Sequence, residues 1–166
     1  MPIPNLTPLQ QWICDTCGQV ILEPDHGYAE IVADSDDMLT EFRIQHHAPH
    51  SPLKNGCLLP TGAAIYHNHL NYYLGPDGMT VILGYIDQGA HNQDVAASRV
   101  HPQHMRDWAD FMRRVQLPYF EESRFYLPQA TSDGYIDSHE HRPYLQEMMQ
   151  FMIDKYGAGS DFDSES

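Results

Sequence analysis

Apolar and polar residues change their spacing between the two halves of the chain. In the first half, short β-branched and aromatic runs are separated by turn residues, which predicts strands at 11–14, 19–22, 28–33 and 39–47. The last two strands flank an acidic turn at 34–37 and form a predicted hairpin. In the second half, apolar residues recur at every third or fourth position, which predicts helices at 79–87, 105–115, 118–127 and 143–156. The run 80–82 also suits a strand, but Asp77 before it can cap a helix.

The segment 105–115 shows helical spacing along its whole length. Its apolar stripe consists of Met105, Trp108, Ala109, Met112 and Val115, and its polar face of Arg106, Asp107, Asp110, Arg113 and Arg114. Prolines mark the next segment, because Pro118 stands in its first turn and Pro128 at its end. Gly157 ends the last segment, whose apolar stripe we interpret as core and which consists of Leu145, Met148, Met149, Met152 and Tyr156.

The run Cys14-Asp15-Thr16-Cys17-Gly18 has the spacing with which a turn directs two thiolates at one metal ion. Further donors follow within a few dozen residues, at His46, His47, His50 and Cys57. Structural zinc sites fill four tetrahedral positions with thiolate sulfur and imidazole nitrogen. The sequence therefore predicts a Zn²⁺ site of the Cys3His type, made by the three cysteines and one of these histidines.

The identity of the fourth ligand stays open at the level of sequence. We take His47 as the ligand and His46 and His50 as alternates. A strand over 41–47 points His46 to one face and His47 to the other, and the sequence does not show which face holds the metal. A Cys2His2 alternative leaves Cys57 free and uses Cys14, Cys17, His47 and His50. Without a metal, Cys14 and Cys17 are a buried or redox-active pair.

Together these features predict an α+β protein. Residues 1–60 form a zinc-ribbon-like β-hairpin module, residues 61–156 a three- to four-helix region packed on it, and residues 157–166 a disordered acidic tail. The length of 166 residues suits one domain with at most a small appendage.

Charge narrows the range of partners. The chain has 23 acidic and 9 basic residues and a net charge of −14. A field of that sign repels nucleic-acid phosphates and anionic membranes, so neither is an expected partner, and a protein with a basic surface is favoured. Three cysteines, with no signal-peptide pattern and no apolar run long enough to span a bilayer, argue against a disulfide framework and favour the cytoplasm.

The sequence contains no catalytic motif of high specificity. It lacks the phosphate-binding G-x-x-x-x-G-K-[ST], the dinucleotide-binding G-x-G-x-x-G, the G-x-S-x-G elbow and the H-E-x-x-H of zinc proteases. If the protein is an enzyme, the alternative is a metal-dependent hydrolase such as an HNH-like nuclease, with His67, His69 and His46 as candidate catalytic residues. A second C-x-x-C is absent and the charge is unfavourable for a polyanionic substrate, so a non-enzyme is favoured.

Several short motifs follow one another between residues 12 and 127. They are Cys14-x-x-Cys17-Gly18, Gly27-Tyr28-x-Glu30, Phe42-Arg43-Ile44-x-His46-His47, Cys57, Leu74-Gly75-Pro76-Asp77-Gly78 and Leu117-Pro118-Tyr119-x-Glu121-Glu122-x-Arg124. This succession resembles a group of small uncharacterised zinc-ribbon proteins of bacteria and phages. The resemblance implies no activity. It implies that the three cysteines act together with His46 or His47.

The sequence-based hypothesis is a non-catalytic, acidic cytosolic protein with a structural zinc site. It acts by binding a macromolecular partner with a basic surface, as an immunity protein, an antitoxin or a phage-encoded inhibitor does. Aromatic residues that could instead form a homo-oligomer interface are Trp12, Tyr72, Tyr73 and Tyr119.

Overall fold

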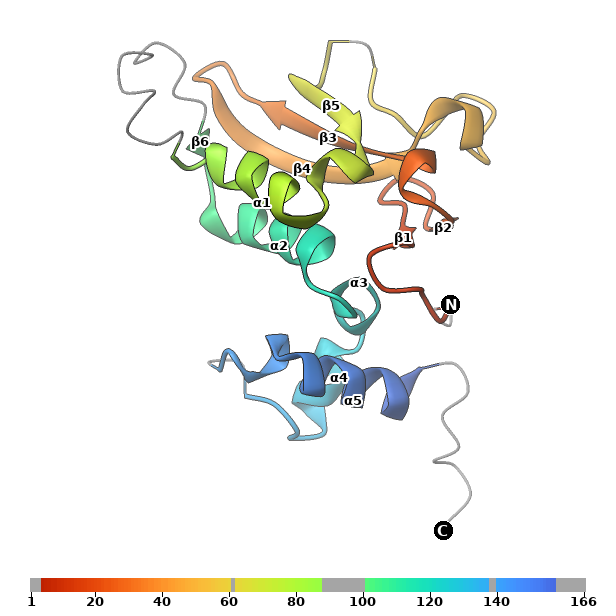
Figure 1. Ribbon diagram of the computed structural model, residues 1–166, viewed down its shortest axis with the longest axis vertical. Helices are drawn as coiled ribbons and strands as arrows, with labels where there is room; N and C mark the ends of the chain where they lie inside the picture. Colours follow the sequence, from red (N-terminus) through yellow and green to blue (C-terminus); the bar gives the residue numbers. More distant parts are fainter. Residues whose placement is uncertain (1–3, 61, 88–100, 138–139, 158–166) are drawn as a thin grey trace.

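The computed structural model of the chain describes residues 4–60, 62–87, 101–137 and 140–157. They form the mixed α+β fold that the sequence predicts (Figure 1). The strands and the first two helices make up one part of the molecule, and the last three helices lie beside it as a smaller part. The predicted disordered tail falls on residues 158–166, outside the described residues, apart from Gly157.

A four-stranded sheet in the order β5-β3-β4-β6 is the centre of the larger part. Strands β3 (Gly27–Ala33) and β4 (Met38–His46) form the predicted antiparallel hairpin. Strand β5 (Tyr66–His69) pairs antiparallel with β3, and β6 (His101–Pro102) pairs parallel with β4. A separate two-stranded sheet consists of β1 (Trp12–Ile13) and β2 (Val20–Ile21).

Strands β5 and β6 correct the expectation that residues 61–156 are a helical region packed on a sheet from residues 1–60. Both strands come from that region and complete the sheet. They span only four and two residues, which is too short for a two-residue period to stand out in the sequence. The hairpin and the later helices therefore share one structural unit.

The alternation of side chains along β3 gives the sheet two different faces. Ile31 is fully buried in the main core, on the same face as the helices. Tyr28 and Glu30 point to the opposite face, where His69 and His67 of β5 are their cross-strand neighbours. The two faces thus carry different chemistry, apolar on one side and rich in imidazole on the other.

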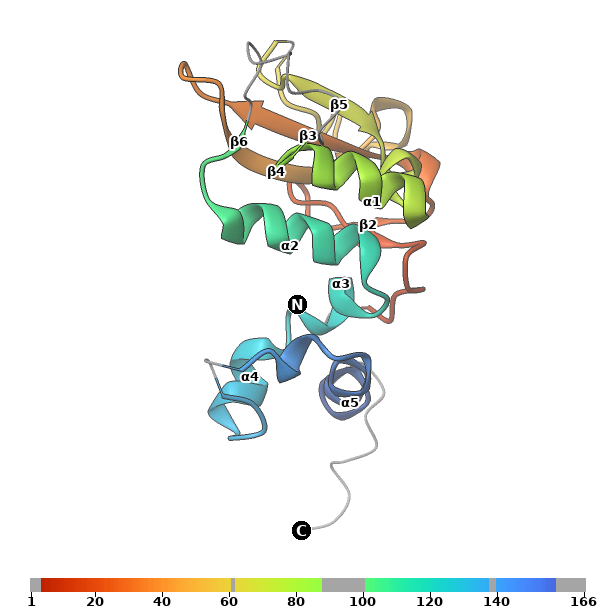
Figure 2. The same cartoon turned by 60° about the vertical axis from the view of Figure 1, so that its left-hand side comes forward.

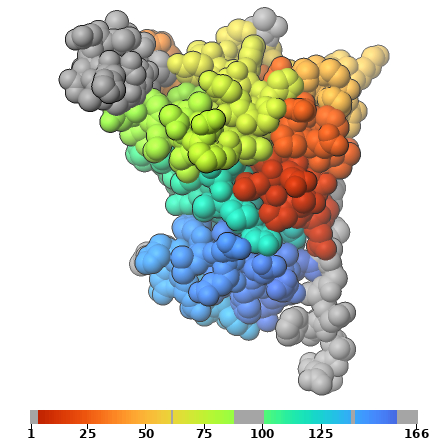
Figure 3. All heavy atoms as spheres, in the orientation of Figure 1, coloured from red at the N-terminus to blue at the C-terminus, as the bar shows by residue number. Residues whose placement is uncertain are grey.

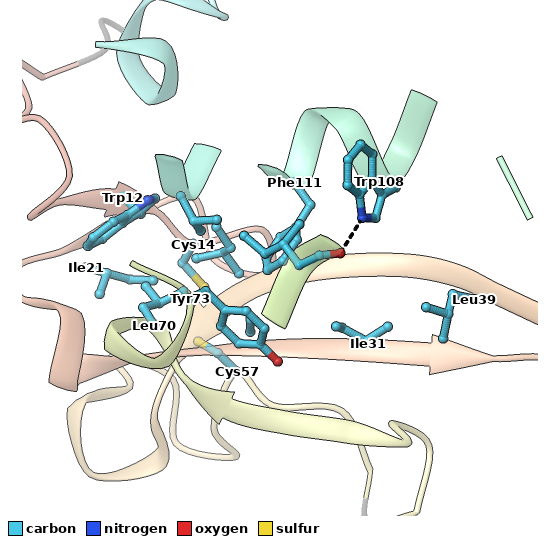
Figure 4. Close-up of a cluster of buried hydrophobic side chains, with 14 residues drawn as sticks. Trp12, Cys14, Ile21, Ile31, Leu39, Cys57, Leu70, Tyr73, Trp108 and Phe111 are labelled. Atoms are coloured by element: carbon cyan, nitrogen blue, oxygen red, sulfur yellow. Dashed lines mark hydrogen bonds between the residues drawn. The ribbon is translucent and has the colours of Figure 1, made fainter. Parts of the chain in front are cut away.

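Helices α1 (Gly75–Gly84) and α2 (Met105–Gln116) cover the apolar face of the sheet (Figure 2). Both correspond to predicted helices, although α1 begins four residues earlier than 79. The indole N–H of Trp108 donates to the carbonyl oxygen of Ile82 at 2.9 Å and so joins the two helices (Figure 4). Their buried side chains complete a core that includes Trp12, Ile21, Ile31, Leu39, Ile44, Leu70, Tyr73, Ile82, Phe111 and Val115.

The last three helices form a second, smaller core beneath the first (Figures 1 and 3). They are α3 (Phe120–Ser123), α4 (Leu127–Ser132) and α5 (Gln146–Tyr156). Met148, Met149 and Met152 are buried, which confirms that the methionine stripe is core, whereas Leu145 is 43% exposed. The other buried members of this core are Phe120, Tyr126, Ala130 and Ile136.

The predicted helix at 118–127 is wrong in its boundaries, because the structure has two short helices there. Tyr119 has a φ of 71°, which interrupts the helical geometry before α3 begins. Pro128 lies in the first turn of α4, where its missing N–H has no helical partner to lose. Pro128 therefore begins a helix instead of ending one. The last helix also starts later than 143, because the 3₁₀ turn η5 (Arg142–Tyr144) precedes it.

A buried ion-pair network centred on Arg114 joins the two parts of the molecule. The Nε of Arg114 donates to Glu121 Oε2 at 2.7 Å, and its Nη2 donates to Glu121 Oε1 at 3.0 Å. The remaining Nη1 donates to Asp15 Oδ2 at 2.7 Å, and Nη2 also reaches the carbonyl oxygen of Ile13 at 3.1 Å. Arg124 adds a 3.1 Å contact to Glu121. One guanidinium thus holds α2, α3 and the chain around residues 13–15 together.

The burial of Arg114 corrects its assignment to the polar face of α2. The residue is only 6% exposed, as is Glu121. Burial by itself disfavours the charged guanidinium, but the facing carboxylates of Glu121 and Asp15 outweigh burial and raise the pKa of Arg114 above its ordinary value. Glu121 also accepts the N–H of Ile13 at 3.0 Å. Each charge in the network is therefore compensated by direct contacts.

Replacing Arg114 with methionine is expected to destabilise the protein by about 3–5 kcal/mol, because Glu121 would stay buried without its main partner. Urea unfolding followed by tryptophan fluorescence measures this loss. The double variant Arg114→Met, Glu121→Leu should be more stable than the single variant, since it removes both buried charges. Arg113→Met is the control on the same helix and should cost at most about 1 kcal/mol. Equal losses at Arg113 and Arg114 would contradict the network's role.

Candidate metal centre

The first two donors lie on the turn that connects β1 to β2. The N–H of Gly18 donates to the carbonyl oxygen of Cys14 at 2.9 Å, and the N–H of Cys14 donates to that of Gln19 at 2.9 Å. Gly18 has a φ of 71°, a left-handed conformation that glycine adopts without a steric cost. The turn therefore brings Cys17 back towards Cys14.

Two further donors reach this turn from the end of β4 and from the loop behind it. His46 is the last residue of β4, and Cys57 follows the 3₁₀ turn η2 (Ala48–His50). The Nδ1 of His46 lies 3.5 Å from Cys17 Sγ and 4.0 Å from Cys57 Sγ. The donor atoms of Cys14, Cys17, His46 and Cys57 all lie within 4.8 Å of one another. Tetrahedral donors at bond lengths of about 2.1–2.3 Å stand about 3.6–3.8 Å apart, so this group could hold a metal ion.

The second ring nitrogen of His46 has a partner that fixes the role of the first. His46 Nε2 lies 3.2 Å from the carbonyl oxygen of Val20. Because a carbonyl oxygen can only accept, Nε2 carries the proton, which leaves the lone pair of Nδ1 directed at the thiols. Metal-bound histidines usually hold their other nitrogen in this way. The contact to β2 thus orients the imidazole before any metal arrives.

Cys57 is held by a polar network beneath the group. Ser51 Oγ lies 3.1 Å from Cys57 Sγ, and Thr16 Oγ1 donates to the carbonyl oxygen of Cys57 at 3.0 Å. Thr16 also contacts the side chain of Gln45, which is fully buried and in turn donates to Glu30. Glu30 is 3% exposed and accepts the N–H of Leu59 at 2.9 Å from the same loop. The loop that carries Cys57 is therefore fixed to the β1–β2 turn at the cysteine itself and to β3 at Leu59.

The group is largely closed to solvent. Cys14 is 1% exposed, Cys57 2% and His46 5%, and Cys17 is half-buried. Figure 4 shows Cys14 and Cys57 at the edge of the main core, close to Leu70 and Tyr73. Four protein donors in such a position are typical of a structural metal site, since catalytic sites keep one position open for water or substrate.

Burial also changes the acid–base properties of the metal-free group. Desolvation, with smaller contributions from Cys14 and Cys57, raises the pKa of Cys17 from 9.0 to about 12, against a lowering effect of its contact with Gln19. Desolvation lowers the pKa of His46, although the contact with Val20 opposes this shift. At neutral pH the Cys17 thiol is therefore protonated and the His46 imidazole is neutral.

The structure brings His46, and not His47 or His50, to the three cysteines. The ring of His47 lies 4.4 Å from that of Tyr28 and 4.9 Å from that of His69, measured between centroids. The ring of His50 stacks on that of His26 at 3.7 Å. At the end of β4, both histidines therefore lie on the opposite face of the sheet from His46.

The candidate catalytic set of His46, His67 and His69 is not brought together. His46 is buried among the thiols, whereas His67 and His69 lie on β5 and contact Tyr28 with ring centroids 6.1 and 4.3 Å away. The Nδ1 of His69 is buried without a hydrogen-bond partner among the described residues. Within the described part of the chain, the only group of donors within metal-binding distance is the one around His46.

Residues that support the site were missing from the sequence-based prediction. Thr16, Gln45 and Glu30 have no spacing that marks them as partners, because they meet only through the pairing of β3 with β4 and the return of the loop. Asp15 is different, because it stands between the two cysteines. It accepts the N–H of Ile44 at 2.7 Å and the guanidinium of Arg114 at 2.7 Å. Its position inside the C-x-x-C run was the signal that could have identified it.

Comparison with known proteins adds no further evidence. No protein-family model matches the chain, and neither does any curated protein or solved structure. The resemblance to small bacterial zinc-ribbon proteins therefore stays a prediction. Among the described helices, none combines the length and the apolar character needed to cross a bilayer.

Metal binding is expected to release protons and to become stronger as the pH rises. The raised pKa of Cys17 means that a metal ion must displace its proton at any pH below about 12. Calorimetric titration with Co²⁺, in two buffers of different ionisation enthalpy at pH 6.5 and 7.5, gives the number of protons released and the change in affinity. An affinity that does not depend on pH would contradict coordination by the thiols.

Proposed function

We propose that Cys14, Cys17, His46 and Cys57 bind one Zn²⁺ ion with a structural role. The support is the donor set itself, because three thiolates and one imidazole in a closed tetrahedral group match the preferences of zinc. The ion would connect the β1–β2 turn, the end of β4 and the loop around Cys57. Each of these elements is short or irregular, so the ion would supply much of their folding free energy.

The His46→Ala and His47→Ala variants test this assignment directly. Elemental analysis of protein purified without added metal should find one zinc per chain in the parent and in His47→Ala, and well below one in His46→Ala. Thermal unfolding should shift downwards in His46→Ala and, after chelation, in the parent. Zinc loss in His47→Ala with retention in His46→Ala would overturn the assignment.

We further propose that the protein is a non-catalytic binding protein whose acidic surface meets a partner with a basic surface. The supporting observation is the asymmetry of exposed charge. Only Lys54, Arg106 and Arg142 are exposed among the described basic residues. The exposed acidic residues in the described part of the chain are Asp15, Glu23, Asp25, Asp34, Asp36, Asp37, Glu41, Asp77, Asp87, Asp107, Asp133, Asp137, Glu140, Glu147 and Asp154. Such a surface attracts a basic protein over long range and speeds the encounter.

The hairpin tip between β3 and β4 is the densest part of this surface. Asp34 Oδ1 accepts the N–H groups of Asp36 and Met38, both at 2.9 Å, so one carboxylate is used to hold the turn. Asp36 and Asp37 are exposed beside it. A rigid turn that presents free carboxylates costs little conformational entropy on binding.

The closed metal group favours this function over hydrolysis. A metal-dependent hydrolase needs a coordination position for water or substrate. Four protein donors leave none at this ion, and His67 and His69 lie on the opposite face from His46. The nuclease alternative is therefore the weaker proposal.

A partner recovered from the native cell should bind with an affinity that falls roughly tenfold or more between low and moderate salt. Two charge-reversal variants, Asp36→Lys at the hairpin tip and Asp154→Lys on α5, change the net charge equally. Asp36→Lys should weaken binding more than Asp154→Lys, because only the former lies on the dense acidic tip. Binding that is insensitive to salt and unchanged in Asp36→Lys would refute the proposal.

A further inference from the structure

The few basic residues of this acidic chain are not spread evenly. Of its 9 lysines and arginines, five arginines line a single cleft of about 790 Å³, namely Arg43, Arg106, Arg113, Arg114 and Arg124. The residues that line the cleft come mainly from β4, α2 and the last helices. Its volume is within the range of about 300–1,000 Å³ that is usual for small-molecule sites. The cleft therefore has the size of a ligand site and gathers most of the guanidinium groups of an acidic chain.

One wall of the cleft is an open part of the edge of β4. Strand β6 pairs only with Met38 and Leu39. The next attachment on this edge is Ile44, which exchanges hydrogen bonds with Asp15. Residues 40–43 line the cleft between these two points, and on this edge, away from β3, no strand pairs with them in the described part of the chain. Phe42 and Tyr144 contribute aromatic surface to the walls.

The arginines differ in how far their N–H donors are already used. The N–H donors of Arg114 are used by Glu121, Asp15 and Ile13, so this residue stabilises the fold and is not free to bind a ligand. Arg106 is exposed and makes no hydrogen bond or ion pair with the described residues. Arg124 has a buried Nε without an acceptor in the described structure. Arg113 donates to Asp110 at 2.8 Å, and its guanidinium carbon lies 3.9 Å from the ring centre of Tyr144.

Unused guanidinium donors in a concave site favour an anionic occupant. Arg106 and the exposed part of the Arg124 guanidinium can donate to an oxyanion without giving up a contact of the fold, and such charge-assisted hydrogen bonds are favourable. Burial, followed by repulsion from Arg114, lowers the pKa of Arg124. A negative group in the cleft would offset both effects. Guanidinium groups suit carboxylate and phosphate oxygens in particular, because they can donate two parallel hydrogen bonds.

We propose that this cleft binds a small organic anion that carries a carboxylate or phosphate group, held by Arg106, Arg113 and Arg124 beside Phe42 and Tyr144.

The lining also limits the charge of the ligand. Four carboxylates, those of Asp15, Glu41, Asp107 and Asp110, stand among the five guanidinium groups. Glu121, which bonds to Arg114 and Arg124 behind this lining, is a fifth carboxylate and balances the fifth guanidinium group. The attraction therefore comes from the individual donors that the fold leaves unused, which suits a ligand with a single anionic group. A polyanion such as a nucleic acid or a triphosphate would face these carboxylates and the surrounding negative surface.

Matched probes test the proposal and separate the two anionic groups. Benzoate and phenyl phosphate carry the same ring on a carboxylate or a phosphate, and tripolyphosphate serves as the polyanion. Each is titrated into the zinc-loaded full chain in low-salt buffer, with binding followed by calorimetry or by NMR shifts. One of the two aromatic anions should bind with a Kd in the range of about 1 mM or below, and tripolyphosphate more weakly.

The Arg106→Ala variant should weaken this binding by about tenfold, since it removes a charge-assisted hydrogen bond. Arg106 has no partner in the described fold, so unfolding is not expected to interfere. Lys54→Ala removes the same charge outside the cleft and should change the affinity less than twofold. The proposal fails if neither aromatic anion binds, if tripolyphosphate binds more tightly, or if Lys54→Ala weakens binding as much as Arg106→Ala. The zinc content and the salt dependence of partner binding are separate measurements, so this failure would not affect the proposed function.

Discussion

The fold depends most on the contact between Arg114 and its two carboxylates. The chain forms two cores, one around the sheet and one among the last helices. Glu121 lies at the start of the second core and Asp15 on the turn with the cysteines, and Arg114 bonds to both. Because a buried charge tolerates no loss of its partners, this contact fixes the position of three elements at once. Apolar packing alone would leave their relative orientation less strictly defined.

Chain-local signals predicted the hairpin over 28–47, the helices α1, α2 and α5, and the cysteine pair, because each leaves a period or a spacing in the sequence. The sequence-based predictions that failed concern residues whose positions depend on contacts between distant segments. The spacing of apolar residues assigns Arg114 to the polar side of its helix. It is nevertheless buried, because the carboxylates of Asp15 and Glu121 compensate its positive charge. His46 and His47 have the same chemistry and adjacent positions. Their roles differ only because β4 ends where one of them faces the turn.

The distribution of charge follows a simple division between surface and interior. Carboxylates cover the outside, whereas most guanidinium groups are drawn inwards to the junction of the two parts. Arginine suits such a junction because its stem packs against apolar side chains while its head bonds in several directions. The same arrangement gives the molecule two kinds of recognition surface. The acidic exterior suits a large basic partner, and the arginine cleft suits a small anion.

Asp15 stands between Cys14 and Cys17 in the sequence. Its carboxylate also accepts hydrogen bonds from Arg114 and from the edge of β4. A continuous set of hydrogen bonds therefore runs from the cysteine turn to α2 and, through Glu121, to the helices of the second core. A metal ion bound by the cysteine turn would therefore be expected to stabilise the last helices as well. A protease that cleaves only loosened helices near the C-terminal end would in effect report whether a metal ion is bound at the other end of the chain.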